Sequence, residues 1–443
     1  METLEQLRTG DLQGTRRLSL SCDLSDFPEE IFTLAESLEI LDLSNNCLSS
    51  LPNDLPRLHN LKVLFLNGNQ FETVPEILAQ CSKLSMISFK SNQLSKLSET
   101  ALPLQTRWLI LTNNQLTTLP ASLGKLTKLQ KLMLAGNSLQ SLPIELSDCL
   151  NLELIRIAAN QLSALPIGLL SLPRLAWIAY AGNPFCAELA TLKHPSSPLK
   201  QIDWTTLSVR EQLGQGASGV IYRGIWHNGS SPQEVAIKLF KGNVTSDGLP
   251  TDEMQACIAA GSHQNLVSVL GQVMNHPTQT EGLVFPFIPA DYKVLGGPPS
   301  LESCTRDTYE PGTQFPLKKG LRIAKDIAAA VAHLHSRGIL HGDLYPHNIL
   351  TNSSGNSFLG DFGAAAFFDL AVHSLGKALE RIEVRAFGCL LQDLLEHCPP
   401  QDAETHPEVF QTLQGIQQAC LSPMVTGRPQ FQAIINKLDE LAI

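Results

Sequence analysis

The chain has 443 residues, of which 43% are hydrophobic and 17% charged, and its formal net charge is −10 at pH 7. Such a composition is typical of folded globular domains, and the length allows about three of them. The negative charge disfavours nucleic acid or an anionic membrane as the main partner, because both attract basic surfaces.

Residues 1–14 lack the apolar core of a signal peptide. No run reaches the roughly 18 consecutive apolar residues that a membrane helix needs. The ten cysteines are scattered without a CxxC pair, which is typical of reduced thiols. We therefore expect a cytoplasmic protein without a membrane span.

A repeat occupies the N-terminal part of the chain. Asparagines recur in the frame LxxLxLxxNxLxxLP at spacings of 22 or 23 residues, at Asn46, Asn69, Asn92, Asn114, Asn137, Asn160 and Asn183. Leucines in this frame would fill a stacked coil, and each buried asparagine would bind backbone groups of the turn after a strand. The repeat resembles the leucine-rich-repeat family, which implies an α/β solenoid of about eight repeats over residues 1–195.

Outward-facing strand positions of such a solenoid form columns on its concave face. The column six residues before each asparagine is unusually apolar and reads Ile40, Val63, Met86, Trp108, Lys131, Leu154 and Trp177. Exposed apolar patches tend to mark interfaces. We expect a protein ligand, or the chain's own C-terminal domain, to bind this face; scattered surface hydrophobes without a partner are the alternative.

A Pro/Ser-containing segment, Lys193–Pro198, follows the repeats and predicts a hinge. We assign residues 196–204 to a linker and residues 205–443 to a second domain.

Glycine-rich and charged motifs open this second domain. Gly214, Gly216 and Gly219 lie between two predicted strands, where backbone amides could close over phosphate. Lys238 follows on the next predicted strand, and Glu253 comes 15 residues later on a predicted helix. This spacing suits an ion pair between strand and helix.

Two further motifs come in order: His341-Gly-Asp-Leu-Tyr-Pro-His-Asn348 and Asp361-Phe-Gly363. Together with the glycine loop and Lys238, they resemble the protein-kinase family over residues 205–443. The resemblance implies a bilobal α+β kinase fold that uses ATP and Mg²⁺.

The resemblance also implies a role for each matching residue. Asp343 would accept the proton of the substrate hydroxyl, while Asn348 and Asp361 would hold Mg²⁺. Lys238, held by Glu253, would fix the phosphates. The remaining nucleotide contacts would come from the glycine loop, the adenine-facing side chains and the interlobe hinge, namely Gly214, Gly216, Gly219, Ile221, Ala236, Leu350, Pro286 and Ile288, with Phe285 guarding the back of the pocket.

The sequence departs from the family's pattern at several positions. Gly342 replaces the arginine before the catalytic aspartate, and Tyr345 replaces the basic residue two positions after it. Glu383 aligns with the family's anchoring aspartate, 22 residues after Asp361, and Ser374 is the only hydroxyl candidate between them. We therefore expect no activation by loop phosphorylation. Residues 295–316 form a Gly/Pro-rich insertion without readable chemistry.

Four histidines, at positions 333, 335, 341 and 347, could suggest a metal cluster. Histidines at these positions are ordinary in the kinase family, and we prefer that interpretation.

The leading hypothesis is a serine/threonine-directed protein kinase whose repeats bind a protein partner or regulate the kinase in cis. A pseudokinase scaffold that acts through protein contacts is the alternative, and Tyr345 favours it. A kinase of small molecules would also explain the short segment after Asp361.

Overall fold

The computed structural model describes residues 3–186, 199–229 and 231–442. The chain forms two compact units: Met1–Arg174 with Asn183–Phe185, and Leu175–Gly182 with Cys186–Ile443. The predicted hinge Lys193–Pro198 lies outside the described residues. The division into 1–195, 196–204 and 205–443 stays a prediction.

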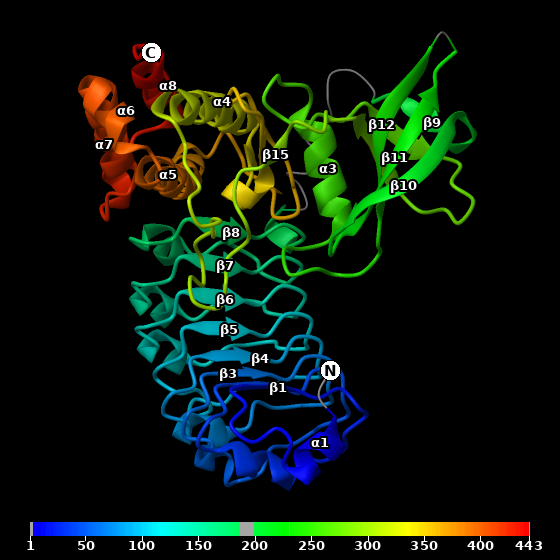
Figure 1. Ribbon diagram of the computed structural model, residues 1–443, viewed down its shortest axis with the longest axis vertical. Helices are drawn as coiled ribbons and strands as arrows, with labels where there is room; N and C mark the ends of the chain where they lie inside the picture. The colour runs from blue at the N-terminus through cyan, green and yellow to red at the C-terminus, as the bar shows by residue number, and fades with distance from the viewer. Residues whose placement is uncertain (1–2, 187–198, 230, 443) are drawn as a thin grey trace. The chain divides into compact units, whose positions relative to one another are not determined.

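Short parallel strands, one from each repeat, form the sheet of the first unit (Figure 1). The strands are β1 (Arg17–Ser19), β2 (Ile40–Asp42), β3 (Val63–Phe65), β4 (Met86–Ser88), β5 (Trp108–Ile110), β6 (Lys131–Met133) and β7 (Leu154–Arg156). The helical segments are α1 (Leu4–Thr9), η1 (Glu29–Leu34), η2 (Leu55–Arg57), η3 (Glu76–Gln80), η4 (Ala121–Lys125), η5 (Ile144–Asp148), η6 (Ile167–Ser171) and η7 (Pro184–Cys186). Adjacent strands lie about 4.8 Å apart, so the leucines of successive repeats stack into one continuous core.

The repeated asparagines join neighbouring repeats. In one example, Asn69 Nδ2 donates to the carbonyls of Leu43 and Leu66 at 2.9 and 3.1 Å. Its Oδ1 accepts the amide of Leu48 at 2.9 Å. Each such bond satisfies a buried group that would otherwise cost about 1–3 kcal/mol. The predicted role of the asparagines is confirmed.

The prediction of a solvent-exposed apolar column on the strands is wrong for several of its members. Val63 and Met86 are only 5% and 4% exposed. Val63 lies directly opposite Ile40 on one side and Met86 on the other, so neighbouring side chains cover one another. The Lys131 ammonium lies over the Trp108 ring, 4.2 Å from its centroid. A protein ligand on this face stays a prediction.

The main sheet of the second unit contains the two strands that flank the glycine loop, β10 and β11. The six strands run in the order β10-β11-β12-β14-β13-β9. They are β9 (Gln201–Asp203), β10 (Leu207–Gln215), β11 (Gly219–His227), β12 (Pro232–Phe240), β13 (Gly271–Met274) and β14 (Gly282–Pro286). Strand β9, from the end of the predicted linker, pairs in parallel with β13, and its Ile202 is part of the core of the sheet.

Local sequence explains helix α3 (Pro250–Ala260), which follows β12. Pro250 occupies the first turn, where its missing N–H leaves no bond unmade. Acidic Asp252 and Glu253 in the same turn suit the positive end of the helix dipole. The helix ends at Gly261, whose φ of +66° favours glycine. These boundaries place Glu253 one turn from the helix start.

A group of helices forms the remainder of the second unit (Figure 1). The helical segments are η8 (Trp204–Thr206), α4 (Leu317–Ser336), η9 (Pro346–Asn348), α5 (His373–Glu396), α6 (Pro400–Thr405), α7 (Pro407–Cys420), η10 (Val425–Gly427) and α8 (Phe431–Asp439). The remaining strands are β8 (Trp177–Ala179), β15 (Lys293–Val294), β16 (Ile339–Leu340), β17 (Ile349–Thr351), β18 (Ser357–Leu359) and β19 (Ala366–Phe367). Helix α4 buries Leu317, Leu321, Ala324 and Ala328 at the three- and four-residue spacing of an amphipathic helix.

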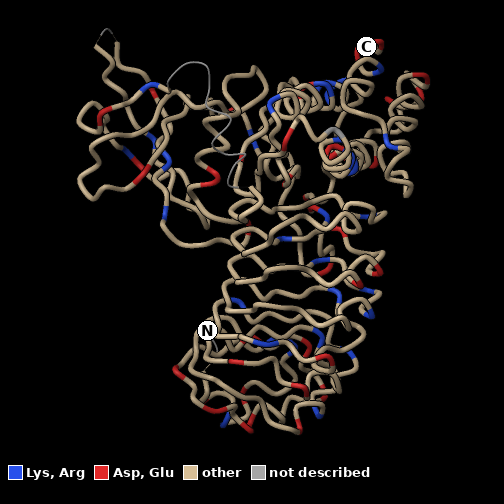
Figure 2. Tube along the Cα trace, turned by 180° about the vertical axis from the view of Figure 1, so that it is seen from behind, with Lys and Arg blue, Asp and Glu red and all other residues tan. Residues whose placement is uncertain are grey.

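Acidic and basic residues are interspersed along the trace of each unit (Figure 2). Among the described residues, no helix combines the length and the apolar character needed to span a bilayer.

Candidate active site

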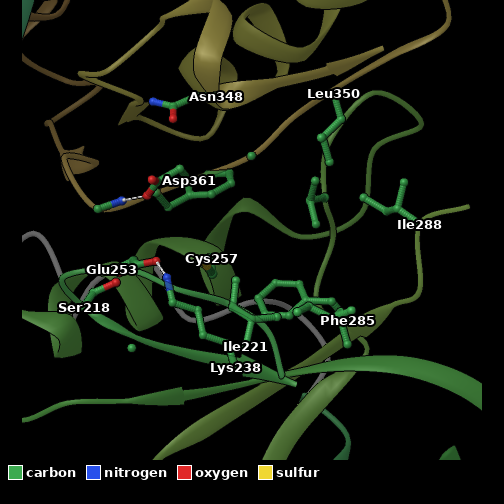
Figure 3. Close-up of a pocket in the computed structure, with 18 of the residues that line it drawn as sticks. Ser218, Ile221, Lys238, Glu253, Cys257, Phe285, Ile288, Asn348, Leu350 and Asp361 are labelled. Atoms are coloured by element: carbon green, nitrogen blue, oxygen red, sulfur yellow. Dashed lines mark hydrogen bonds and ion pairs between the residues drawn. The ribbon is translucent and has the colours of Figure 1, made fainter. Parts of the chain in front are cut away.

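A cavity of about 490 Å³ brings together most of the residues singled out in the sequence (Figure 3). Its walls come from the glycine loop, strands β11 and β12, helix α3, the end of β14 and the 341–348 and 360–363 loops. The predicted residues that line it are Gly216, Gly219, Ile221, Ala236, Lys238, Glu253, Phe285, Pro286, Ile288, Asn348, Leu350 and Asp361. Gly214 and Asp343 are not among the lining residues.

Lys238 and Glu253 form the predicted ion pair between β12 and α3 (Figure 3). The Glu253 side chain is only 2% exposed, so its charge needs this partner. Burial opposes the charge on Lys238, but Glu253 and Asp361 outweigh it and raise the pKa of the ammonium. Lys238 is therefore a fixed cation in the wall of the cavity.

Asp361 and Asn348 face the cavity from two adjacent loops (Figure 3). Asp361 adopts a left-handed φ of +51°, which is uncommon for a non-glycine residue. Its Oδ1 accepts the Gly363 amide at 3.1 Å. Asn348 Nδ2 donates to the carbonyl oxygen and to Oδ2 of Asp343, at 2.9 and 2.8 Å. These two bonds engage the amide nitrogen and orient the Asp343 carboxylate. The amide oxygen of Asn348 is the atom that could hold a metal ion.

The three glycines of the loop differ in whether packing requires glycine at their positions. A Cβ on Gly219 would lie 2.5 Å from the carbonyl oxygen of Leu239, so the packing of β11 on β12 requires glycine. A Cβ on Gly214 or Gly216 would meet no atom of the described chain within 4 Å. Packing therefore gives no reason for glycine at these two positions, and close approach of a ligand to the backbone would give one.

Apolar side chains form the end of the cavity near strand β14. Ile221 and Ala236 lie on β11 and β12. Leu350 lies on β17, across the cavity from Ile221 (Figure 3). Phe285 is 9% exposed and ends the pocket on this side. Pro286 and Ile288 follow and also line the cavity. A flat apolar ring would fit between these walls.

Glu383 on α5 anchors the 341–348 loop, as predicted. Its Oε1 accepts the Gly342 amide at 2.7 Å, and its Oε2 accepts the His341 amide at 3.3 Å. His335 Nε2 contacts Oε2 at 2.6 Å. His335 and backbone amides lower the pKa of Glu383 even though burial acts in the opposite direction. The loop is thus held by an ionised carboxylate.

Asp307, in the 295–316 insertion, is a further residue of the site that the sequence did not reveal. Its buried carboxylate accepts the His347 amide at 2.7 Å and lies 2.8 Å from His347 Nδ1. His347 lines the cavity next to Asn348. Burial opposes protonation of His347, but Asp307, with Asp343 and Asp361, raises its pKa. The insertion therefore braces the loop that carries Asp343 and Asn348.

The four histidines have separate partners. His333 Nε2 contacts the Ala260 carbonyl at 2.8 Å, and His341 Nε2 contacts the Gly360 carbonyl at 2.8 Å. His335 and His347 pair with Glu383 and Asp307. Each imidazole supports backbone or a carboxylate of its own.

A protein kinase domain has a sheet with a glycine loop and a helix whose glutamate pairs with a strand lysine. It also has a loop aspartate and a loop asparagine that face this pair across one cavity, as Asp361 and Asn348 do here. Comparison with known families agrees. Residues 207–385 match the profile for protein tyrosine and serine/threonine kinases, and residues 13–71 match the leucine rich repeat. The chain therefore carries leucine-rich repeats followed by a protein kinase domain, and the predicted fold class is confirmed.

Two relatives come from Dictyostelium discoideum. The chain is 27% identical over 281 residues to the probable serine/threonine-protein kinase gdt4 and 26% identical over 279 residues to the probable serine/threonine-protein kinase gdt2. Each alignment covers 54% of this chain but only 16% of the relative. The chain thus matches about one sixth of the length of these curated relatives.

Proposed function

We propose that the protein is an ATP- and Mg²⁺-dependent protein kinase directed at serine or threonine. The observation that carries the proposal is the arrangement of one cavity: the Lys238–Glu253 pair is formed on one side, and Asn348 and Asp361 face it from the other. Enzymes that transfer phosphate rely mainly on such positioning and on fixed charge. The names of both relatives support serine/threonine specificity.

The cavity suits a nucleotide along its whole length. Ile221, Ala236 and Leu350 would enclose the adenine ring, and backbone groups of Pro286 and Ile288 would hydrogen-bond its edge. The amides of the glycine loop would bind the phosphates together with Lys238, whose raised pKa keeps it charged.

Two oxygen ligands suit a magnesium ion at the phosphate end. The Asp361 carboxylate and the Asn348 amide oxygen are hard donors of the type Mg²⁺ prefers, and the phosphates would supply others. The bound ion would offset the negative charge of the phosphates during transfer. Asn348 has a second task, because its amide nitrogen fixes the Asp343 carboxylate. Asp343 would then accept the proton of the attacking hydroxyl.

The repeats supply the protein-binding part of the proposal. We propose that they bind a protein partner or regulate the kinase in cis, in a cytoplasmic setting. Ten free thiols support this location, because disulfides are rare there.

Tyr345 supports a second candidate, a pseudokinase scaffold. The family's basic residue at this position steadies the transferred phosphate, whereas Tyr345 is an uncharged ring that is only 3% exposed. A scaffold would bind nucleotide, or nothing, and act through protein contacts alone.

Transfer of labelled γ-phosphate from Mg·ATP by the full-length protein separates the two candidates. We expect autophosphorylation or labelling of a generic basic protein, and loss of this activity in Asp361→Ala. Asp343→Asn should lower the rate by a factor of about 10² to 10⁴ while nucleotide binding is kept. Full-rate transfer by Asp343→Asn would refute the assigned base. Silence of the wild type with retained nucleotide binding would favour the scaffold.

A further inference from the structure

The segment Leu175–Gly182, here called the β8 segment, comes from the last copy of the repeat frame but belongs to the second unit. All three residues of its strand β8 are buried. It meets the kinase domain at two of the positions where the sequence departs from the family's pattern, Tyr345 and Gly342.

The first of these positions is Tyr345. The Trp177 ring stacks on the Tyr345 ring with centroids 4.2 Å apart and planes at 9°. Its Nε1 donates to the carbonyl of Leu344 at 3.1 Å. Tyr345 in turn stacks on His347, the neighbour of Asn348, at 5.0 Å. Trp177 therefore contacts both the backbone and a side chain of the loop that carries Asp343.

The second position is Gly342. Its φ is +76°, which favours glycine. A Cβ there would lie 2.4 Å from the carbonyl oxygen of Ile178 and 2.7 Å from that of Ala364. The backbone of the β8 segment thus approaches so closely that an arginine cannot occupy this position in the present conformation.

A third contact reaches the segment that follows Asp361. Tyr180 Oη donates to the carbonyl of Phe367 at 3.3 Å, and Tyr180 is 1% exposed. Phe367 belongs to β19, which pairs with β16 immediately before the 341–348 loop. The β8 segment therefore joins the residues that follow Asp361 to the loop of Asp343.

From these contacts we propose that Trp177 and Tyr180 are positioning residues of the kinase: they hold the 341–348 loop and β19 in the arrangement required for phosphate transfer. In kinases activated by loop phosphorylation, contacts between arginine and phosphate order this region. Here the buried β8 segment orders this region without phosphorylation. The proposal rests on the kinase activity proposed above.

The alternative, that the segment blocks the active site, fits the contacts less well. No residue of the β8 segment lines the described nucleotide cavity. With the segment in place, the Lys238–Glu253 pair is formed and Glu383 holds the Gly342 amide. The ion pair and the anchored loop are therefore in place while Trp177 and Tyr180 make their contacts.

Full-length variants test the proposal. Trp177→Ala removes both the stack and the N–H donor, Trp177→Phe keeps an aromatic stack, and Tyr180→Phe removes only the hydroxyl. Ile144→Ala, which shortens an 80% exposed apolar side chain of the first unit outside the strand column, is the control. For Trp177→Ala we expect kcat to fall about 10²-fold, the effect of a misplaced reacting group, with the KM for ATP within about threefold. Trp177→Phe should recover most of this loss, and Ile144→Ala should show no such fall in kcat.

Hydrogen exchange of the same variants supplies a measurement that does not depend on activity. Trp177→Ala should speed exchange in residues 341–348 and 361–367, whereas exchange in α3 stays unchanged. A kcat that rises in Trp177→Ala would identify an inhibitory segment and overturn the proposal. Unaltered kcat, or unaltered exchange in both loops, would overturn it as well. If the wild type transfers no phosphate, the proposed function fails, and the exchange result alone decides whether the segment orders the loops.

Discussion

The buried pair of His335 and Glu383 makes the stability of the kinase domain depend on pH. His335 on α4 lies 2.6 Å from Glu383, and Glu380 lies 3.9 Å away on the same helix as Glu383. Burial would lower the pKa of His335, but the two carboxylates raise it to about 9 from its ordinary value of 6.5. The perturbation that tests this coupling is His335→Gln, which removes the titrating group and leaves a polar side chain.

The size of the stability contribution of His335 follows from the shift in its pKa. Each pKa unit corresponds to about 1.4 kcal/mol of differential stability, so this imidazolium contributes about 3 kcal/mol. The folded-state pKa is the higher one, so the contribution is complete below pH 6.5 and is lost as the pH rises through about 9. The lowered pKa values of Glu380 and Glu383 act only below their ordinary value of 4.5 and leave this window unaffected.

Urea unfolding between pH 6 and pH 9.5, followed by tryptophan emission in a Trp108→Phe background, measures the effect. The three remaining tryptophans, Trp177, Trp204 and Trp226, all belong to the second unit. The free-energy difference between the wild type and His335→Gln should shrink by about 3 kcal/mol across this range. A difference that stays constant with pH would refute the proton linkage.

Lys238→Met should reduce the rate of phosphate transfer at least about 10²-fold, which steady-state kinetics would measure. It should also destabilise the domain by about 3–5 kcal/mol in urea unfolding, because it leaves Glu253 buried without its cation. Gly219→Ala should lower the free energy of unfolding by about 1–3 kcal/mol, because the added methyl group would clash between β11 and β12. Gly214→Ala should change this free energy by no more than about 0.5 kcal/mol. It should instead weaken nucleotide binding, which titration calorimetry would measure. Asp307→Ala should lower stability by about 1–3 kcal/mol, because it removes the buried acceptor of a backbone amide, and lower kcat, as steady-state assays would report.

Surface variants provide the controls. Lys293→Met on β15 and Glu310→Gln in the insertion change exposed residues of the same types, and neither should alter transfer. Equal losses in Lys293→Met and Lys238→Met would contradict the role given to the ion pair. Full activity and stability of Asp307→Ala would show that the insertion does not brace the loop.

Local spacing made much of this architecture predictable. The asparagine period requires only that each repeat stack on the next, so it identified both the solenoid and the buried amide bonds. Lys238 and Glu253 lie 15 residues apart, close enough for strand and helix signals to predict their pairing. Glu383 could be assigned because it is an acidic residue on the predicted helix that follows Asp361, although the 22-residue separation is short.

Other features depend on tertiary paths that the sequence does not encode locally. Asp307 meets His347 across 40 residues, and a Gly/Pro-rich segment gives no period from which to infer its route. The burial of Val63 and Met86 depends on the close lateral spacing of strands, which the apolar column alone does not reveal. The repeat frame around Trp177 also matches its six predecessors, so nothing in it distinguishes a strand that packs with the kinase domain.

The departures at Gly342 and Tyr345 have a common physical cause in the β8 segment. An arginine at position 342 would require a side chain where the Ile178 and Ala364 carbonyls already lie. A lysine at position 345 would place an ammonium in a site that is 3% exposed and would remove the stack on Trp177. The family's residues are thus incompatible with this packing rather than merely absent. Reversion to the family's residue at either position should therefore lower transfer in this chain, whereas a sequence that had simply decayed at these positions would gain activity from the same change.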